Sequence, residues 1–198
     1  PMHLFTFIGW CIGCTALAML LGYLFDREVR FRRKAEEKAN VDGLTELYNH
    51  RYFQERIYTE IERARRYERP LSLIILDIDD FKAFNDRHGH QEGDRLLTWF
   101  ARTCEQAVRE IDICARYGGE EFTIILPETP SQEAVVVAQR LLESVREGSK
   151  LRFPSPVTAS AGVASFPEHG QTRHALILSA DVALYFAKNS GKDRACPY

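Results

Sequence analysis

The strongest constraint on the fold is a run of 22 residues without a charge, Leu4–Phe25, "LFTFIGWCIGCTALAMLLGYLF". As one α-helix the run would be about 33 Å long, and the hydrocarbon core of a bilayer is about 30 Å thick. The run therefore predicts one transmembrane helix within residues 1–25. A buried core helix is the alternative, which the lack of a polar face disfavours.

A basic segment follows this run and predicts its orientation. Positive charges collect on the cytoplasmic side of a span, so everything after Phe25 is expected in the cytoplasm. A signal peptide fits less well, because the positive charge follows the apolar stretch instead of preceding it. The basic residues are Arg27, Arg30, Arg32, Arg33, Lys34 and Lys38.

Residues 26–41 are highly charged and are expected to form a helical linker to a folded domain over residues 42–198. Within the span, Gly9 and Gly13 form a G-x-x-x-G, a spacing that lets two helices approach closely. Cys11 and Cys14 form a C-x-x-C, but no second pair of ligands accompanies them. Helical packing of small residues is therefore preferred to a metal or redox site.

Composition limits the remaining chain to one ordinary globular core. The protein has 198 residues, of which 45% are hydrophobic and 27% charged, enough for one sizeable core. The net charge of −2 does not favour bulk binding to nucleic acid. Five cysteines, an odd number, fit a reduced compartment better than a disulfide framework.

Apolar periodicity after the linker alternates between strand and helix. The stretch "LSLIILDID" is short and nearly continuously apolar, which is typical of a strand covered on both faces. Alternating runs on both sides of Gly118 and Gly119 predict a β-hairpin, because glycine tolerates the positive φ that tight turns need. The expected fold class is α/β (α+β), with a mixed, mainly antiparallel sheet flanked by helices. Helices are expected over about 49–67, with Thr45 as a candidate cap, near "RLLTWFARTCEQAV", "SQEAVVVAQRLLESVRE" and "TRHALILSADVALYFAKN", and another strand near "VTASAGVASF".

Acidic residues stand at the ends of two expected strands. Asp77 and Asp79 close the first strand, and Glu120 and Glu121 sit on the hairpin turn. Mg²⁺ takes one or two carboxylates and completes its shell with phosphate oxygens and water, so these acids could hold it beside a phosphate. The alternative is that they are solvated turn charges.

A polar segment after the first strand favours a nucleotide site. The stretch "FKAFNDRHGHQEGD" contains Lys82, Asn85, His90 and Asp94. Lysine can contact phosphates, and a carboxylate can accept hydrogen bonds from the ring N–H and amine of guanine, which adenine does not offer. Spacing alone does not establish such a pocket.

Four motifs in order resemble one known family. "RYGGEEF" and "LDIDDFKAFNDRHGHQEGD" resemble the GGDEF domain of bacterial diguanylate cyclases, and "DGLTELYNHRYF" and "AKNSGKDR" are similar to its opening and closing motifs. The resemblance covers about residues 41–194. It implies a fold like nucleotidyl-cyclase and polymerase palm domains, and condensation of two GTP into cyclic di-GMP with release of two pyrophosphates.

The resemblance also implies a role for each matching residue. Asp77 would bind Mg²⁺ (or Mn²⁺) through its carboxylate and Ile78 through its carbonyl. Glu120 would bind metal and help to deprotonate the attacking 3′-hydroxyl, with Glu121 as a further metal ligand. Lys192 stands where the family often has Arg, and Lys lacks the bidentate fork. The remaining residues are Lys82, Lys188 and Lys192 for phosphate, Asn85 and Asp94 for guanine, and Phe81, His90, Gly118 and Gly119 around the substrate.

An R-x-x-D motif precedes the hairpin. Arg109 and Asp112 resemble the family's inhibitory site, which binds product dimers and slows turnover. Guanidinium can stack on guanine or pair with phosphate, and the acid can accept from the guanine edge. The alternative is a surface Arg and an Asp at a helix-to-strand junction.

Three functions follow as hypotheses. The first is a membrane-anchored diguanylate cyclase at the inner membrane, single-pass, acting as a homodimer that holds one GTP in each subunit, with no nucleic-acid partner. The second is a non-catalytic module that binds GTP or cyclic di-GMP and acts through a partner; relatives of this kind lose turn acids or glycines, and this chain keeps all four. The third makes a mixed cyclic GMP–AMP product, which the presence of Asp94 disfavours.

Overall fold

The computed structural model describes residues 19–25, 27–28 and 39–198 and divides the chain into two compact units, Pro1–Asn40 and Val41–Tyr198. No helix within those described ranges is long and apolar enough to cross a membrane. The expected span, with its glycine and cysteine pairs, lies mostly outside the described residues, as does most of the expected linker.

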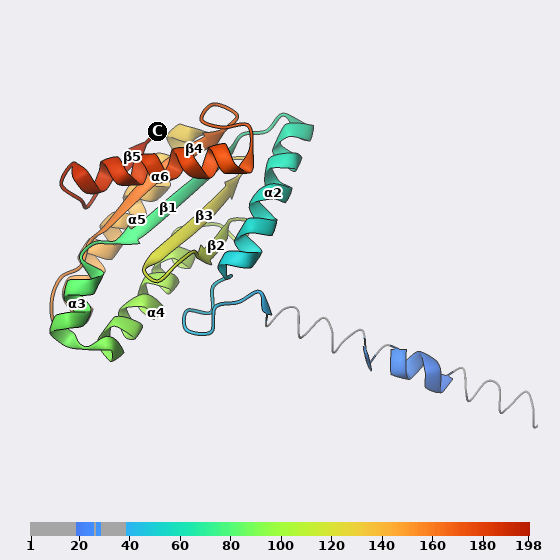
Figure 1. The fold of residues 1–198 in the computed structure, drawn as a ribbon, viewed down its shortest axis with the longest axis horizontal. Coiled ribbons are helices and arrows are strands. Elements are labelled where there is room, and N and C mark those ends of the chain that lie inside the picture. Colours follow the sequence, from blue (N-terminus) through green and yellow to red (C-terminus); the bar gives the residue numbers. More distant parts are fainter. Residues whose placement is uncertain (1–18, 26, 29–38) are drawn as a thin grey trace, which may run out of the picture. The chain divides into compact units, whose positions relative to one another are not determined.

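Helices and strands alternate along this unit, with two helices in succession after the first strand and a hairpin in the middle (Figure 1). The hairpin confirms the prediction made from the two alternating runs. The elements are α2 (His50–Tyr67), β1 (Leu71–Ile78), α3 (Phe81–His88), α4 (His90–Ala107), β2 (Ile113–Arg116), β3 (Glu121–Pro127), α5 (Ser131–Arg152), β4 (Ala159–Phe166), α6 (Arg173–Asn189) and β5 (Ala195–Pro197).

The strands form one mixed sheet in the order β2-β3-β1-β4-β5. The pairs β1–β3, β1–β4 and β2–β3 are antiparallel, and only β4–β5 is parallel among the described strands. The predicted mixed, mainly antiparallel sheet is therefore confirmed. The sequence did not predict β5, a three-residue strand without a periodic pattern of its own.

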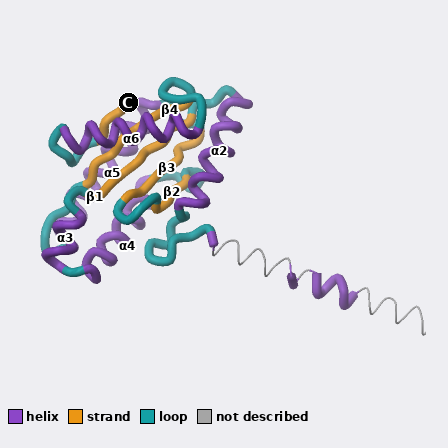
Figure 2. The backbone as a smooth tube through the Cα atoms, viewed as in Figure 1, coloured by secondary structure: helices purple, strands orange, loops and turns teal. Residues whose placement is uncertain are grey.

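Helices cover both faces of the sheet, which is why β1 is buried along its whole length (Figure 2). On one face α2 and α6 pack over Leu73 and Ile75, and on the other α4 and α5 pack over Ile74 and Leu76. Alternate residues of a strand point to opposite faces, so a run of apolar residues serves both cores. The two cores hold the strand ends that carry the acidic residues.

The turn before α2 is built differently from the prediction. Asn49 caps α2 by accepting a hydrogen bond from the Tyr52 N–H at 3.1 Å. The prediction of Thr45 as the cap is wrong, because its N–H and hydroxyl both donate to Asp42 Oδ1, at 2.9 and 2.7 Å. Thr45 stabilises the turn that follows Asp42 instead of the helix.

The polar segment after β1 is helical. The sequence predicted a helix only near "RLLTWFARTCEQAV", but the structure has α3 and then α4, which begins at His90. Gly89 separates the two helices with φ of 85°, a conformation that glycine adopts without strain. The segment is therefore two helices meeting at a corner, which brings α3 and the start of α4 together.

Candidate active site

The acidic site forms where β1 ends beside the start of β3. Asp77 lies opposite Glu121 in the β1–β3 register, and the Ile78 N–H donates to the Glu120 carbonyl at 3.3 Å. Glu121 is the first residue of β3, so only Glu120 of the pair lies in the turn itself. Backbone pairing therefore places Asp77 and both glutamates at one end of the sheet.

Asp77 is the buried member of this group. Its side chain is 9% exposed, and Lys188 Nζ lies 2.7 Å from its Oδ1. The ion pair is close, yet this buried oxygen receives no aligned hydrogen bond. Lys188 therefore supplies the positive charge beside this buried oxygen.

Burial and neighbouring charge raise the pKa of both acids. Burial is the main cause for Asp77, and the charges of Glu121 and Asp79 add to it, while Lys188 opposes it. For Glu120 burial again comes first, followed by the charge of Asp77, with Lys188 opposing. Carboxylates crowded in this way gain from a shared cation.

The residues present fit a divalent cation of the Mg²⁺ type. Asp77 offers a buried carboxylate oxygen, which Lys188 contacts in this structure, and Glu120 lies close enough for the two charges to interact. Across the described ranges, no group of three His, Cys, Asp or Glu side chains is arranged to hold a metal. Mg²⁺ needs only one or two carboxylates when phosphate oxygens and water complete its shell.

Asp79 does not belong to this site, although the sequence placed it beside Asp77. Its carboxylate accepts hydrogen bonds from Thr158 Oγ1 at 2.7 Å, Ser160 Oγ at 2.8 Å and the Asp193 N–H at 3.2 Å. These bonds tie the end of β1 to β4 and to the loop before β5. Asp79 therefore has a structural role.

Arg116 fixes the turn between β2 and β3. Its Nε donates to the Gly118 carbonyl at 3.1 Å and its Nη2 to the Gly119 carbonyl at 2.7 Å. Its Nη1 lies 3.1 Å from Asp42 Oδ1. Burial would raise the pKa of Asp42, but hydrogen bonds from Thr45 and Arg116 outweigh it and lower the pKa.

The sequence did not predict this clamp, which consists of Arg116 and Asp42. The two residues are 74 positions apart, so no local pattern relates them. The sequence offered one indication of their importance: Arg116 begins the motif "RYGGEEF" and Asp42 begins the motif "DGLTELYN". Because three donors of one guanidinium are used, the turn is held before any ligand binds.

The two glycines of the turn do not adopt the positive φ that the sequence suggested. Positive φ among the described glycines occurs at Gly89 and Gly191, not at Gly118 or Gly119. A Cβ at Gly118 would lie 2.6 Å from Glu121 Oε2, whereas a Cβ at Gly119 would meet nothing within 4 Å. Gly118 therefore leaves room for the glutamate, and the prediction of positive φ is wrong.

The predicted guanine-binding residues lie on α3 and α4. Asn85 Oδ1 is buried without a hydrogen bond, and a Cβ at Gly93 would lie only 1.8 Å from it. Gly93 therefore lets the Asn85 side chain approach α4. Asp94, one residue later, is exposed.

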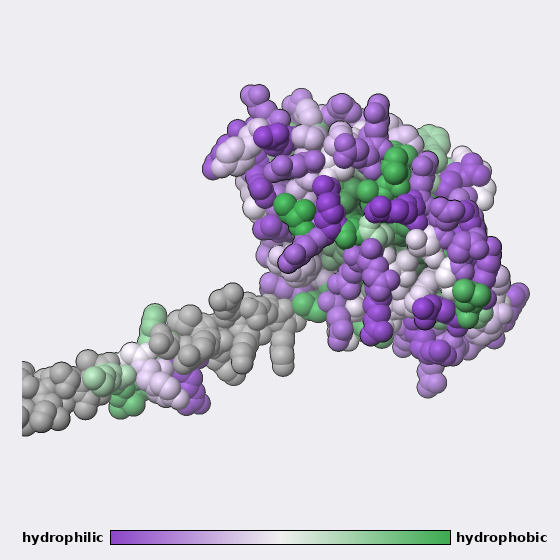
Figure 3. Space-filling model, turned by 180° about the vertical axis from the view of Figure 1, so that it is seen from behind, coloured by the Kyte–Doolittle hydropathy of each residue, from purple (hydrophilic) through white to green (hydrophobic). Residues whose placement is uncertain are grey.

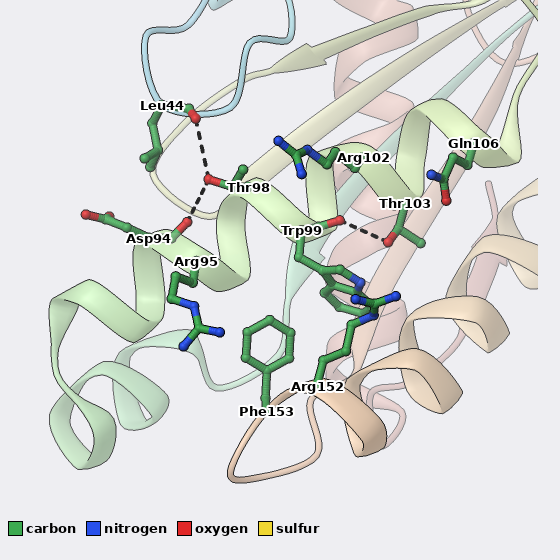
Figure 4. Close-up of a pocket in the computed structure, with 10 residues that line it drawn as sticks. All are labelled: Leu44, Asp94, Arg95, Thr98, Trp99, Arg102, Thr103, Gln106, Arg152 and Phe153. Atoms are coloured by element: carbon green, nitrogen blue, oxygen red, sulfur yellow. Dashed lines mark hydrogen bonds between the residues drawn. The ribbon is translucent and has the colours of Figure 1, made fainter.

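Asp94 lies at one end of a groove of about 570 Å³ along α4 (Figure 4). Its carboxylate points away from Trp99 and Phe153, toward the side on which Leu44 lies. At this end, Thr98 Oγ1 links α4 to the loop before α2, because it donates to the carbonyls of Asp94 and Leu44, at 2.9 and 3.4 Å. Asp94 therefore lies at the edge of this groove, with its carboxylate directed away from the groove's aromatic residues.

The other residues predicted to bind phosphate and substrate do not contact the acidic group of Asp77 and Glu120, with one exception. Lys82 and His90 are exposed on α3 and at the start of α4, and Phe81 is 7% exposed in the core. Lys192 Nζ donates to Asp80 Oδ1 at 2.6 Å. Only Lys188 of the three predicted phosphate-binding lysines contacts the acidic group directly.

Arg109 and Asp112 lie at the opposite end of the hairpin. They precede β2, whose first residue, Ile113, pairs with Ile125. The Arg109 N–H donates to Asp112 Oδ2 at 2.8 Å, and its Nη2 donates to Thr129 Oγ1 at 2.6 Å. Asp112 Oδ1 is buried without a hydrogen bond, at a pocket of about 360 Å³. The length of β3 separates this pair from Glu120.

Comparison with known proteins matches this arrangement. The family described as "Diguanylate cyclase, GGDEF domain" matches residues 39–194. This chain is a member of the GGDEF-domain family.

Individual GGDEF proteins agree in sequence and in structure. A diguanylate cyclase of Vibrio cholerae is 36% identical over 171 residues, which is 86% of this chain and 53% of that protein. The coiled coil and GGDEF domain of DgcB from Caulobacter crescentus, solved in complex with c-di-GMP, superimposes with a TM-score of 0.81 at 28% identity, covering 88% of this chain and 93% of that one. The active GGEEF domain of a diguanylate cyclase from Vibrio cholerae gives 0.72 at 33% identity, covering 76% and 96%.

The chain corresponds to only part of many relatives in the GGDEF family. It spans between 22% and 54% of the length of eight curated relatives with which it aligns. Within the GGDEF domain, Asp77, Glu120 and Lys188 come together from three of the four motifs recognised in the sequence.

Proposed function

We propose that the protein is a diguanylate cyclase that condenses two GTP into cyclic di-GMP and two pyrophosphates. Membership of the GGDEF family and the diguanylate cyclases among its relatives support this activity. The observation that carries the proposal is the buried carboxylate of Asp77, paired with Lys188 and lying beside Glu120. A degenerate binding module would have no need for this costly group of charges.

The chain's own residues account for the proton and the phosphate charge. Glu120 accepts the proton of the 3′-hydroxyl, and its raised pKa makes it a stronger base than an ordinary glutamate. The hydroxyl oxygen then forms a bond to the α-phosphorus of the other GTP as the bond to pyrophosphate breaks. Lys188 and Lys82 offset the negative charge that develops on the phosphates.

A divalent cation, Mg²⁺ or Mn²⁺, would be held by Asp77, the Ile78 carbonyl and Glu120, with Glu121 as a further candidate. Bound there, it supplies positive charge that stabilises the phosphate oxygens during displacement. Asn85 and Asp94 hold the guanine, with Phe81, His90, Gly118 and Gly119 around the nucleotide and Lys192 toward its phosphates.

Two identical half-sites are needed, since each subunit binds one GTP and the two nucleotides must face each other. We therefore propose a homodimer with two-fold symmetry, the usual solution for identical subunits. The N-terminal apolar run would anchor each chain in the inner membrane with the GGDEF domain in the cytoplasm.

Product inhibition would act at Arg109 and Asp112. The buried Asp112 Oδ1 and the mostly exposed Arg109 guanidinium offer an acceptor and donors to a guanine edge and a phosphate. Asp112→Ala should raise the cyclic di-GMP concentration needed for half inhibition at least tenfold while leaving the initial rate unchanged. An unchanged inhibition curve would count against this site.

The deciding experiment incubates the chain with GTP and Mg²⁺ and identifies the products. Cyclic di-GMP and pyrophosphate in a 1:2 ratio are expected, and ATP should not compete. GTP binding without turnover at high protein concentration would favour the non-catalytic module instead. A mixed product from ATP and GTP would favour the cyclic GMP–AMP variant.

A further inference from the structure

The groove along α4 has a positively charged part that the acidic site does not use. The face of the domain on which α4 and α5 lie is predominantly hydrophilic, with small hydrophobic areas between the charged side chains (Figure 3). Three arginines and one acid, Asp94, line the groove. Because the Asp94 carboxylate points away from Trp99 and Phe153, the charged groups around these two rings are all positive (Figure 4).

Two of the three arginines have no partner within the described part of the chain. Arg95 lies 2.5 Å from Glu92, with which it forms an ion pair along α4. Arg102 on α4 and Arg152, the last residue of α5, make no side-chain hydrogen bond or ion pair with any described residue. Guanidinium groups that line one space from two helices can each bind phosphate oxygens through a pair of N–H groups.

Two aromatic rings line the same part of the groove. Trp99 and Phe153 are half-buried, and their ring centroids lie 5.3 Å apart at an interplanar angle of 64°. Gly148 of α5 makes room for the indole, since a Cβ there would lie 2.8 Å from Trp99 Cζ2. The indole is therefore held against α5 while part of its surface lines the groove, and an open aromatic surface of this kind can stack on a flat ring.

We propose that this groove binds a nucleoside polyphosphate, with the phosphates on Arg102 and Arg152 and the base against Trp99. The volume of about 570 Å³ is that of a small-molecule site. A bare anion would leave the rings in water, and an uncharged aromatic molecule would leave both guanidinium groups unpaired. The site is separate from the one proposed for GTP, because the Asp94 carboxylate and the Trp99 ring point in different directions from α4.

Tryptophan fluorescence of the full-length chain tests the proposal. The sequence contains two tryptophans, so Trp10→Phe leaves Trp99 as the only one. ATP is the probe, because the proposed guanine-binding residues do not favour adenine, and EDTA removes divalent cations. The emission of Trp99 should change in a saturable way, with half-saturation below about 1 mM ATP. Emission that does not change, or that changes without saturating, would overturn the proposal.

Substitution of the arginines tests the phosphate contacts. Arg102→Gln and Arg152→Gln, each made in the Trp10→Phe chain, should raise the ATP concentration for half-saturation about tenfold. Both side chains are exposed, so the fold should be kept, which far-ultraviolet circular dichroism checks. A double variant that binds ATP as tightly as its parent would refute the assignment.

Two controls separate this groove from general charge and from the proposed GTP site. Arg66→Gln removes an exposed positive charge from α2 and should leave the titration unchanged. Asn85→Ala alters a predicted guanine-binding residue and should also leave it unchanged. Weakening of ATP binding by either control as large as that from the groove variants would contradict a separate site.

Competitors identify which parts of the ligand are recognised. Adenosine and pyrophosphate should each displace ATP only at concentrations at least about tenfold higher than ATP itself, since each uses one half of the groove. Polyglutamate that changes Trp99 emission where ATP does not would show that the groove docks an acidic protein segment, and the proposal would fail. The titration contains neither GTP nor Mg²⁺, so its outcome is independent of whether the protein is a cyclase.

Discussion

The surroundings of Asp77 and Glu120 disfavour the charged form of each carboxylate. Both have a raised pKa, chiefly through burial; the charges of Glu121 and Asp79 add to the shift at Asp77, and the charge of Asp77 adds to the shift at Glu120. Lys188 offsets part of this cost at Asp77. Such a group is unfavourable for folding and useful only when a ligand brings positive charge.

Glu120→Gln should therefore separate activity from stability. GTP turnover should fall by about 10³-fold, since the substitution removes the base. The free energy of unfolding at neutral pH should rise by roughly 0.5 kcal/mol, the scale of partly screened charges. Thermal melts should show this gain shrinking in acid, because wild-type Glu120 becomes protonated there.

Glu121→Gln is the matched control for that variant. It is expected to keep more activity, since Glu121 lies in β3 and not in the turn. Equal losses from both substitutions would contradict the assignment of Glu120 as the base.

The pH dependence of turnover follows from the same raised pKa values. Both carboxylates must be ionised to act, so turnover should fall as the pH drops through values above the ordinary 3.8 and 4.5 of Asp and Glu. The free energy of unfolding should change in the other direction. Protonation of these two groups in acid stabilises the folded state, because their pKa values are higher in the folded protein than in the unfolded one. A kcat profile that is flat down to pH 4.5 would show that the pKa of Glu120 is not raised.

At the scale of elements, Arg116 connects the turn to the loop before α2. Arg116→Ala should lower kcat by roughly 10- to 100-fold, because the Gly118 and Gly119 carbonyls lose their common donor and the turn carrying Glu120 loosens. Stability should fall by about 1–2 kcal/mol, since Asp42 is left without its ion pair. Lys150→Ala, which breaks only an exposed pair with Glu147, should change neither kcat nor the denaturant midpoint.

The contact of α6 with β4 depends on Gly162. A Cβ there would lie 2.1 Å from the Ala180 carbonyl oxygen and 2.3 Å from the Leu184 nitrogen. Gly162→Ala should therefore cost about 2–4 kcal/mol of unfolding free energy in a denaturant titration. Gly43→Ala, where a Cβ meets nothing within 4 Å, is the control and should cost little.

Local patterns predicted the long elements and not the short ones. The continuous apolar run of β1 and the alternation around the hairpin gave correct strands, because burial imposes those periods. α3 and β5 were missed, since their 8 and 3 residues are held by tertiary contact and not by periodicity.

At the site, too, sequence motifs predicted some residues correctly, and long-range contacts decided the rest. The resemblance brought Asp77, Glu120 and Lys188 together correctly, as the Asp77 contacts confirm. The resemblance named only Asp77, but the strand-end pattern grouped Asp79 with it, because the hydroxyls that hold Asp79 come from Thr158 and Ser160, about 80 residues away. Long-range hydrogen bonds of this kind leave no local sequence signal.

At the scale of the whole molecule, Val41–Tyr198 contains both hydrophobic cores and every candidate site residue. A chain of residues 41–198 should fold and convert GTP at high concentration. Its specific activity should fall more steeply on dilution than that of the full chain, if residues 1–40 help two copies to meet. Dilution series that superimpose would show that the domain needs no such help.

The missing side chain at Gly162 has one more consequence. Because helix and strand backbones lie so close there, the position of α6 on β4, and with it that of Lys188 beside Asp77, depends on residue 162. A Cβ that pushes α6 outward would move Lys188 away from Asp77 as well, so a glycine in the core sets the geometry of an ion pair at the site. The Gly162→Ala variant should then lose GTP turnover even at temperatures where it is still folded.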